Sequence, residues 1–147
     1  MFEKLNYIEL SGEKYPLKCD ILVLEKIQEE YGDLSRFENG IRGFTPNVDE
    51  NGEIVINEDG LMVGTSGTPN IKMINKALIW MIREGIEIEK EDSQKEYPEF
   101  TDTALLRKVD MTPRELGAAI HAEFNRCFAR KNGKTTQREE TGKKQKE

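Results

Sequence analysis

The sequence predicts an α+β domain that is mostly α-helical, in which a small N-terminal β-hairpin packs with three to four helices. Two short extended segments open the chain, segments with helical periodicity and capping residues follow, and a glycine-rich stretch interrupts the helical pattern. A chain of 147 residues suffices for one domain and is too short for two ordinary ones. We therefore expect a single helical domain over 1–131, with a Gly-rich loop or β-meander insertion over 40–70, and a disordered basic tail over 132–147.

The N-terminal hairpin is predicted from two extended segments, 5–10 and 13–19, joined by Ser11-Gly12. A Ser-Gly pair between such segments is typical of a tight turn. Pro16 lacks an N–H and cannot donate a backbone hydrogen bond to a neighbouring strand, so its strand is expected at an edge of the sheet.

A first helix is predicted to follow the hairpin directly. Asp20 is a suitable N-cap, apolar residues recur at helical spacing up to Tyr31, and Gly32 tolerates the left-handed conformation that ends many helices. Asp33 is expected to cap a short second helix over 34–39.

The glycine-rich segment contains two dipeptides that are typical of hairpin turns. Asn51-Gly52 and Asp59-Gly60 both suit type I′ turns, and they flank the aliphatic run 54–56. We expect a small β-meander or a loop here and no helix.

The same segment also resembles an EF-hand calcium loop over 47–58. Such a loop needs oxygen ligands at fixed positions and a glycine at the sixth, which here is Gly52. Asparagine at the first position, Pro46 before the loop and Asp59-Gly60 after it count against calcium, and a polar hairpin explains the same letters. A calcium-responsive adaptor therefore remains an alternative function. Its candidate ligands are Asn47, Asp49, Asn51, Glu53 and Glu58.

Two further helices are predicted after the glycine-rich segment. Ile71 to Glu84 has a very broad apolar surface, which is typical of a central helix or of one covered by a partner. Gly85 is expected to end this helix, leaving Ile86 to Glu89 as a strand stub or a continuation. Thr101 or Asp102 can cap a short helix that follows.

The clearest helix start in the sequence lies near the C-terminus. Thr112 as N-cap, Pro113 at the first helical position and Glu115 at the third form the pattern of a capping box. Apolar residues at three-and-four spacing carry this helix to about Arg130.

Nothing in the sequence indicates an enzyme. Cys19 and Cys127 are far apart and His121 is the single histidine, so the usual zinc ligand patterns are missing. No set of nucleophile, base and orienting residue is visible. We expect no catalytic residues, no cofactor and no metal. We also expect no membrane segment, because the longest apolar stretch, 77–82, is too short to span a bilayer.

Charge argues against nucleic acid as a partner. The net charge is −6, and phosphate binding needs clustered cations. Residues 130–147 carry seven basic and three acidic side chains, a net +4 on an otherwise acidic chain. Residues 133–147 contain no apolar residue, which predicts disorder. The last two helices could form a helix-turn-helix, so a small DNA-binding regulator stays as a further alternative, although the body of the final helix is Ala-rich and nearly uncharged.

Three motifs stand in a recognisable order. The strand-to-helix segment YPLKCDILVLEKIQEEYGDL covers 15–34, the aliphatic-aromatic helix ALIWMI with its EGI exit covers 77–86, and MTPRELG over 111–117 opens the last helix. Over roughly 5–37 and 71–128 the chain resembles the tail assembly chaperones of siphophages from Firmicutes and their prophages.

The resemblance implies a non-enzymatic role. Chaperones of this family bind the long helical tape-measure protein, keep it soluble and recruit tail-tube subunits. They act in the cytoplasm of the bacterial host and leave before the virion is mature. A homo-oligomer is also compatible with the broad apolar helix. The tape-measure contacts implied for this chain form one apolar stripe, Trp80, Met81, Leu116, Ile120 and Phe124.

Many members of this family are made in two lengths by a programmed −1 frameshift near the end of the shorter form. In this sequence Arg130-Lys131-Asn132 and Gly142-Lys143-Lys144 are compatible with A-rich slippery heptamers in the required frame. The C-terminal tail would then be the junction to a longer form.

Overall fold

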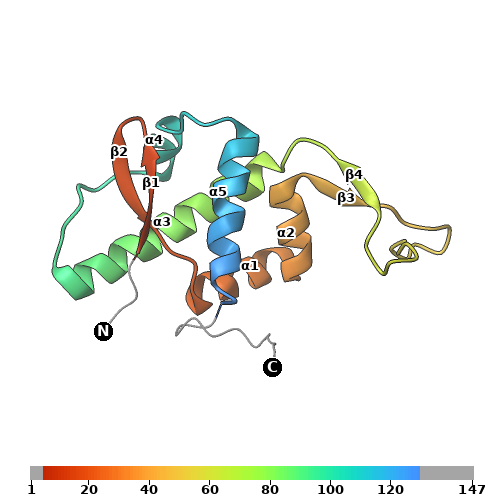
Figure 1. Ribbon diagram of the computed structural model, residues 1–147. Helices are drawn as coiled ribbons and strands as arrows, with labels where there is room; N and C mark the ends of the chain where they lie inside the picture. The colour runs from red at the N-terminus through yellow and green to blue at the C-terminus, as the bar shows by residue number, and fades with distance from the viewer. Residues whose placement is uncertain (1–4, 130–147) are drawn as a thin grey trace, which may run out of the picture.

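The computed structural model describes residues 5–129 and confirms the predicted α+β class (Figure 1). The predicted tail lies outside the described residues. The elements are β1 (Asn6–Leu10), β2 (Glu13–Leu17), α1 (Ile21–Tyr31), α2 (Leu34–Arg42), β3 (Phe44–Pro46), β4 (Gly64–Ser66), α3 (Ile71–Ser93), α4 (Asp102–Arg107) and α5 (Pro113–Arg126).

The N-terminal hairpin forms as predicted. Strands β1 and β2 pair antiparallel, with Ile8 opposite Tyr15. Ser11 and Gly12 both have positive φ, 51° and 82°, which is the signature of a type I′ turn. The hairpin lies along α3, and just past β2 the backbone N–H of Lys18 donates to the carbonyl of Met81 at 3.0 Å.

The first two helices begin and end at their predicted capping residues, with one extension. The Asp20 carboxylate accepts the backbone N–H groups of Leu22 and Val23, and Gly32 ends α1 with φ 82°. Asp33 caps α2, which runs three residues beyond the predicted end at Asn39. The extension carries Ile41 into the core, where it is 1% exposed.

The prediction that Gly85 ends the third helix is wrong. Helix α3 continues through Gly85 to Ser93, so 86–89 are helical and form no strand. A glycine is accepted in mid-helix here because β2 approaches this point closely, at Pro16. The continuation buries Glu89, whose carboxylate accepts hydrogen bonds from the hydroxyls of Tyr7 and Tyr97.

The central element of the core is α3. The hairpin packs along it, and α1, α2 and α5 also contact it. Helix α5 crosses α2 as well, where the rings of Phe37 and Phe124 lie 5.2 Å apart. The predicted capping box is present: the Thr112 hydroxyl accepts from the Glu115 N–H, and the Glu115 carboxylate accepts from the Thr112 N–H. Helix α5 ends at Arg126, earlier than the predicted end near Arg130.

The glycine-rich segment forms a projecting arm, defined here as residues 44–66, that extends away from the helices (Figure 1). Strands β3 and β4 pair at its base. Beyond them the backbones of Asn47, Val55 and Val63 close a ring of three hydrogen bonds, in which the N–H of Asn47 donates to the carbonyl of Val63, that of Val63 to Val55 and that of Val55 to Asn47, at 2.8 to 3.1 Å. The arm thus follows an eight-residue repeat that the sequence analysis did not identify.

The two turns of the arm match each other but are not of the predicted type. Type I′ turns need positive φ at both central residues, and in these turns positive φ occurs at Gly52 and Gly60 alone. Instead the Asp49 carboxylate oxygen accepts two backbone N–H groups that follow it in the first turn, and the Asn57 side-chain oxygen does the same in the second, at 2.9 to 3.0 Å. The side chains therefore shape both turns.

Candidate functional site

Four of the five residues implied as partner contacts lie in the core. Met81 and Ile120 are fully buried, and Leu116 and Phe124 are 2% exposed. A partner cannot reach them while the domain stays folded, so these four are not retained as contact residues. Trp80 is half-buried beside Tyr31, with 6.5 Å between the ring centroids.

An apolar groove open to solvent lies instead between α3 and α4, with a volume of about 520 Å³. Its apolar lining comes from Ile71 and Ile79 of α3 and from Leu106 of α4. Ile71 and Ile79 are eight residues apart and therefore share one helix face. The structure leaves Ile71 43% exposed. The sequence places both isoleucines on an apolar helix but gives no sign that α4 lies beside them.

Charged side chains frame this groove. Lys72 and Lys76 line one side, and the Lys76 ammonium pairs with Glu30 of α1 at 2.8 Å. This hydrogen bond raises the pKa of Lys76 and lowers the pKa of Glu30. Asp102 at the start of α4 pairs with Arg83 at 2.8 Å, which ties α4 to α3. An apolar floor within a charged rim is the form of a surface that takes one face of an amphipathic helix.

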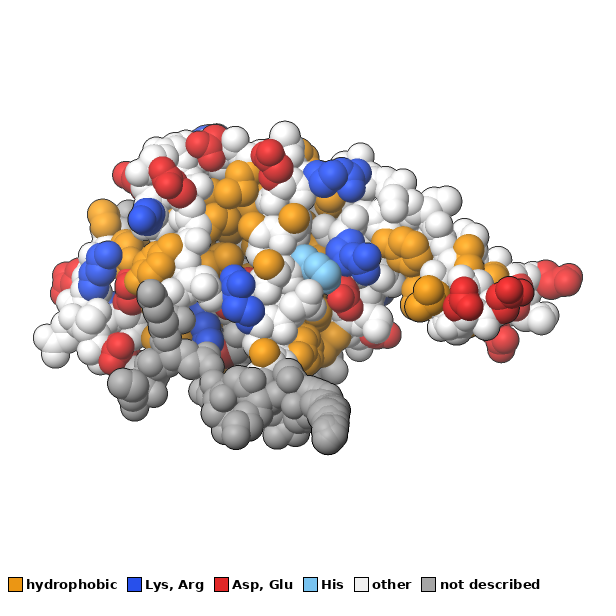
Figure 2. Space-filling model, viewed as in Figure 1, with side chains coloured by type: hydrophobic (Ala, Val, Ile, Leu, Met, Phe, Trp, Pro, Cys, Tyr) orange, Lys and Arg blue, Asp and Glu red, His pale blue; other side chains and the backbone are white. Residues whose placement is uncertain are grey.

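The arm is the second apolar surface. Its exposed aliphatic and sulfur-bearing side chains are Val48, Ile54, Ile56, Leu61 and Met62. Its acidic side chains are Asp49, Glu50, Glu53, Glu58 and Asp59, and no Lys or Arg occurs between Arg42 and Lys72. Figure 2 shows hydrophobic and acidic side chains side by side on the arm.

The candidate calcium ligands do not form the single loop that an EF-hand requires. Asp49 uses one carboxylate oxygen for its own turn, and Glu58 lies in the second turn. No helix directly adjoins the segment 47–58, since β3 and β4 stand between it and helices α2 and α3. Asn47, Asn51 and Glu53 lie in or beside the first turn, where the Asn47 backbone belongs to the hydrogen-bonded ring. The geometry is that of two hairpin turns, which is the alternative to a calcium loop that the sequence of this segment also allows.

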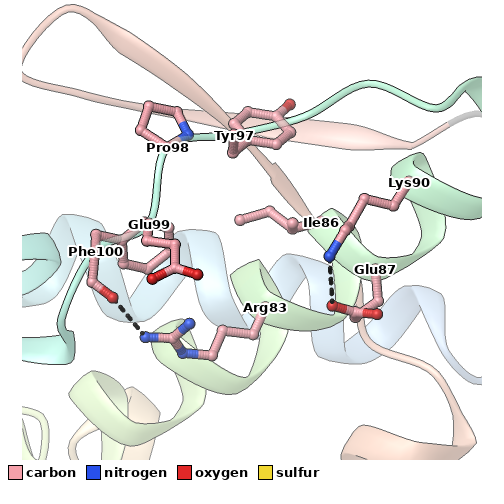
Figure 3. A pocket seen from close by; sticks show the side chains of 8 residues that line it. All are labelled: Arg83, Ile86, Glu87, Lys90, Tyr97, Pro98, Glu99 and Phe100. Atoms are coloured by element: carbon pink, nitrogen blue, oxygen red, sulfur yellow. Dashed lines mark hydrogen bonds and ion pairs between the residues drawn. The ribbon is translucent and has the colours of Figure 1, made fainter.

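The pocket in Figure 3, of about 300 Å³, lies where the segment 97–100 runs along α3. Of the four charged side chains that line it, Arg83, Glu87 and Lys90 are already paired. The Arg83 guanidinium stacks 4.6 Å from the Phe100 ring centroid and donates to the Phe100 carbonyl, while Lys90 pairs with Glu87. These contacts hold the segment 97–100 on the helix, while the Glu99 carboxylate also lines the cavity.

A third cavity, of about 470 Å³, contains both cysteines and Glu84. Burial raises the pKa of Glu84 to about 7, and a hydrogen bond with Asp20 adds to the shift. Burial also raises the pKa of both thiols, and the Cys127 thiol donates to the Cys19 carbonyl at 3.3 Å. A raised pKa keeps a cysteine in the thiol form, which is a poor nucleophile.

Within residues 5–129 no three His, Cys, Asp or Glu side chains are placed to hold a metal ion. His121 pairs with Glu38 of α2 at 2.8 Å. Helix α5 packs across α2 and α3, and the Arg114 guanidinium in its first turn donates to the Gly67 carbonyl at the arm base. A DNA-reading helix would present the side chains of this first turn to base edges, whereas here Arg114 is bound to the arm base.

None of the helices in the described part of the chain combines the length and the apolar character needed to cross a membrane. In comparisons with known proteins, the chain matches no family model, no curated protein and no solved structure.

Proposed function

We propose that this chain is a phage tail assembly chaperone that binds the helical tape-measure protein, keeps it soluble and recruits tail-tube subunits, without catalysis. The resemblance over 5–37 and 71–128 motivates the proposal. The observation that carries it is the apolar groove between α3 and α4, since this groove offers a helical partner a solvent-accessible surface on the body of the domain.

The groove suits a binding role better than a catalytic one. Its floor is aliphatic, with Ile71, Ile79 and Leu106, and its charged side chains stand at the rim. A tape-measure helix could place an apolar ridge on the floor and polar residues against Lys72 and Asp102. Proteins that hold an aggregation-prone helix need this combination, because the apolar surface competes with self-association of the partner.

The proposal predicts that a tape-measure protein is encoded near this gene, and co-expression of that protein with this chain tests the proposal. We expect the tape-measure protein to be insoluble alone and soluble in a complex with this chain. Ile71→Glu and Leu106→Glu place a carboxylate in the groove and should each abolish co-purification. The readout is the soluble fraction and the amount of complex recovered on a tagged copy of this chain.

Ile21→Glu is the matched control. Ile21 is an aliphatic residue on α1, 74% exposed, and does not line the groove. This variant should retain the tape-measure protein in full. The proposal fails if the wild-type chain does not bind the tape-measure protein, and the groove assignment fails if Ile71→Glu and Leu106→Glu bind as well as Ile21→Glu does.

A further inference from the structure

The arm exposes more apolar side chains than its own packing can explain. Each of Val48, Ile54, Ile56, Leu61 and Met62 is at least 40% exposed, and Leu61 is 63% exposed. Only β3 and β4 pair at the base of the arm, and a two-stranded hairpin is marginally stable in water unless a further surface covers it. A projecting segment that keeps five such side chains in solvent is typical of a docking element.

The body of the same molecule does not cover the arm. The arm is fixed at its base, where the N–H of Gly67 donates to the Gly43 carbonyl at 2.6 Å and Arg114 donates to the Gly67 carbonyl at 2.9 Å. From this base it points away from α4 and the hairpin (Figure 1). The groove of the same molecule lies against α4, so the arm points away from it.

The charge of the arm selects the kind of surface that can cover it. Five carboxylates and no cation give it a net charge of −5. Phosphates of nucleic acid or of an anionic membrane would be repelled. A matching surface must be apolar and carry cations at its rim.

The α3–α4 groove of a second copy has both properties. Ile71, Ile79 and Leu106 provide an apolar floor, and Lys72 and Lys76 stand beside it. Lys72 is exposed, and Lys76 pairs with Glu30 at the same rim. Each copy of the chain has one arm and one groove, so two copies can satisfy both surfaces by reciprocal exchange.

We propose that the arm of one copy docks into the α3–α4 groove of a second copy, with the aliphatic side chains on the groove floor and the carboxylates facing Lys72 and Lys76. The inference rests on the groove that the proposed function also uses. In this arrangement the second copy covers the groove until a helical partner displaces it. The contact would keep two apolar surfaces out of solvent at once.

Sedimentation velocity of the full chain alone tests the inference. We expect a concentration-dependent dimer that weakens as salt rises, because the carboxylate–lysine contacts lie at a solvent-exposed rim. The arm variant Ile56→Asn with Leu61→Asn, and the groove variant Leu106→Glu, should each raise the dimer dissociation constant at least tenfold. Ile21→Asn, an equivalent change at an exposed aliphatic residue elsewhere, should leave it unchanged.

Mixing the arm variant with the groove variant separates a direct contact from a general loss of folding. The arm variant still has an intact groove and the groove variant an intact arm, so the mixture should recover a heterodimer that neither variant forms alone. Circular dichroism checks that both remain folded. A wild-type chain that is monomeric at every concentration overturns the inference, and so does a dimer that neither variant weakens. A monomeric chain that still binds the tape-measure protein would remove the inference and leave the proposed function in place.

Discussion

Gly85 of α3 lies directly against Pro16 of β2. A Cβ atom at position 85 would stand 2.8 Å from the Pro16 Cβ and 2.9 Å from its carbonyl carbon, which is closer than packed carbon atoms allow. The hairpin can lie on α3 because this helix position has no side chain. The same contact explains why a long helix tolerates a residue with poor helix propensity at its centre.

Gly85→Ala should therefore destabilise the domain. Alanine favours a helix over glycine by about 1 kcal/mol, but the added methyl group would push β2 off the helix, and overpacking of this kind costs about 1–3 kcal/mol. We expect a net loss in the free energy of unfolding, measured by urea denaturation. Glu91→Ala, at an exposed position of the same helix, is the control and should change stability little. A Gly85→Ala variant that is more stable than wild type would show that the contact with Pro16 is not close.

Gly85 also shows where prediction from the sequence stopped. The caps at Asp20, Gly32 and Thr112 depend on the nearest few residues, so their patterns identified the helix ends correctly. Gly85 has the same local pattern as a helix stop. What decides its role is Pro16, almost seventy positions away, and a contact at that separation cannot be inferred from local propensity.

Glu123 is a buried carboxylate with a defined set of donors. It is 1% exposed and accepts hydrogen bonds from the backbone N–H of Cys19 at 3.0 Å, from the Asn6 amide at 3.3 Å and from Arg126 at 2.9 Å. These contacts tie α5 to the segment between β2 and α1. The sequence places Glu123 on the last helix, but its local pattern does not distinguish it from exposed glutamates.

Glu123→Ala should destabilise the domain by roughly 2–3 kcal/mol, because the buried Cys19 N–H loses its acceptor while Arg126 can turn to solvent. Thermal and urea unfolding measure the loss. Glu38→Ala removes a half-exposed carboxylate that pairs with His121 and serves as the control, with an expected loss below about 1 kcal/mol. Equal losses for the two variants would contradict the role assigned to Glu123.

Glu84 should make stability fall as pH rises. Burial and the neighbouring Asp20, Glu87 and Glu91 raise the pKa of Glu84 from 4.5 to about 7 in the folded protein. Between these values the folded state holds a proton that the unfolded state has lost, so each rise in pH favours unfolding. The penalty is absent below pH 4.5 and complete above pH 7.

Glu84→Gln removes this penalty and keeps a donor for Asp20. We expect the variant to match wild type below pH 4.5 and to be more stable above pH 7. The gain should be about 1 kcal/mol, because Glu84 is partly open to solvent and screening reduces the effect. Urea unfolding at both ends of the range measures it. Glu29→Gln, an exposed change on α1, should produce no such pH-dependent gain, and a Glu84→Gln gain that is the same at all pH values would contradict the assignment.

The candidate site was harder to predict than the fold, for a physical reason. Helix α3 is apolar over much of its circumference, so its sequence does not say which side meets the core and which meets solvent. The stripe chosen from the sequence included Met81, which is fully buried, while the exposed Ile71 was left out. The position of α4 beside α3 decides which side is exposed, and long-range contacts set it, namely the burial of Leu105 and the Arg83–Asp102 pair, rather than any local pattern.

Asp49 and Asn57 occupy equivalent places in the two turns of the arm, and this equivalence is testable. Each side-chain oxygen accepts two backbone N–H groups, so Asp49→Ala and Asn57→Ala should each release two donors in their own turn. Because the arm buries little of itself, we expect faster amide hydrogen exchange near the altered turn and almost no change in the free energy of unfolding of the domain. Asn51→Ala, which changes the first turn without removing the accepting side chain, is the control. Global destabilisation by either variant would show that the arm is part of the cooperative core, and unchanged exchange in both would show that the side chains do not shape the turns.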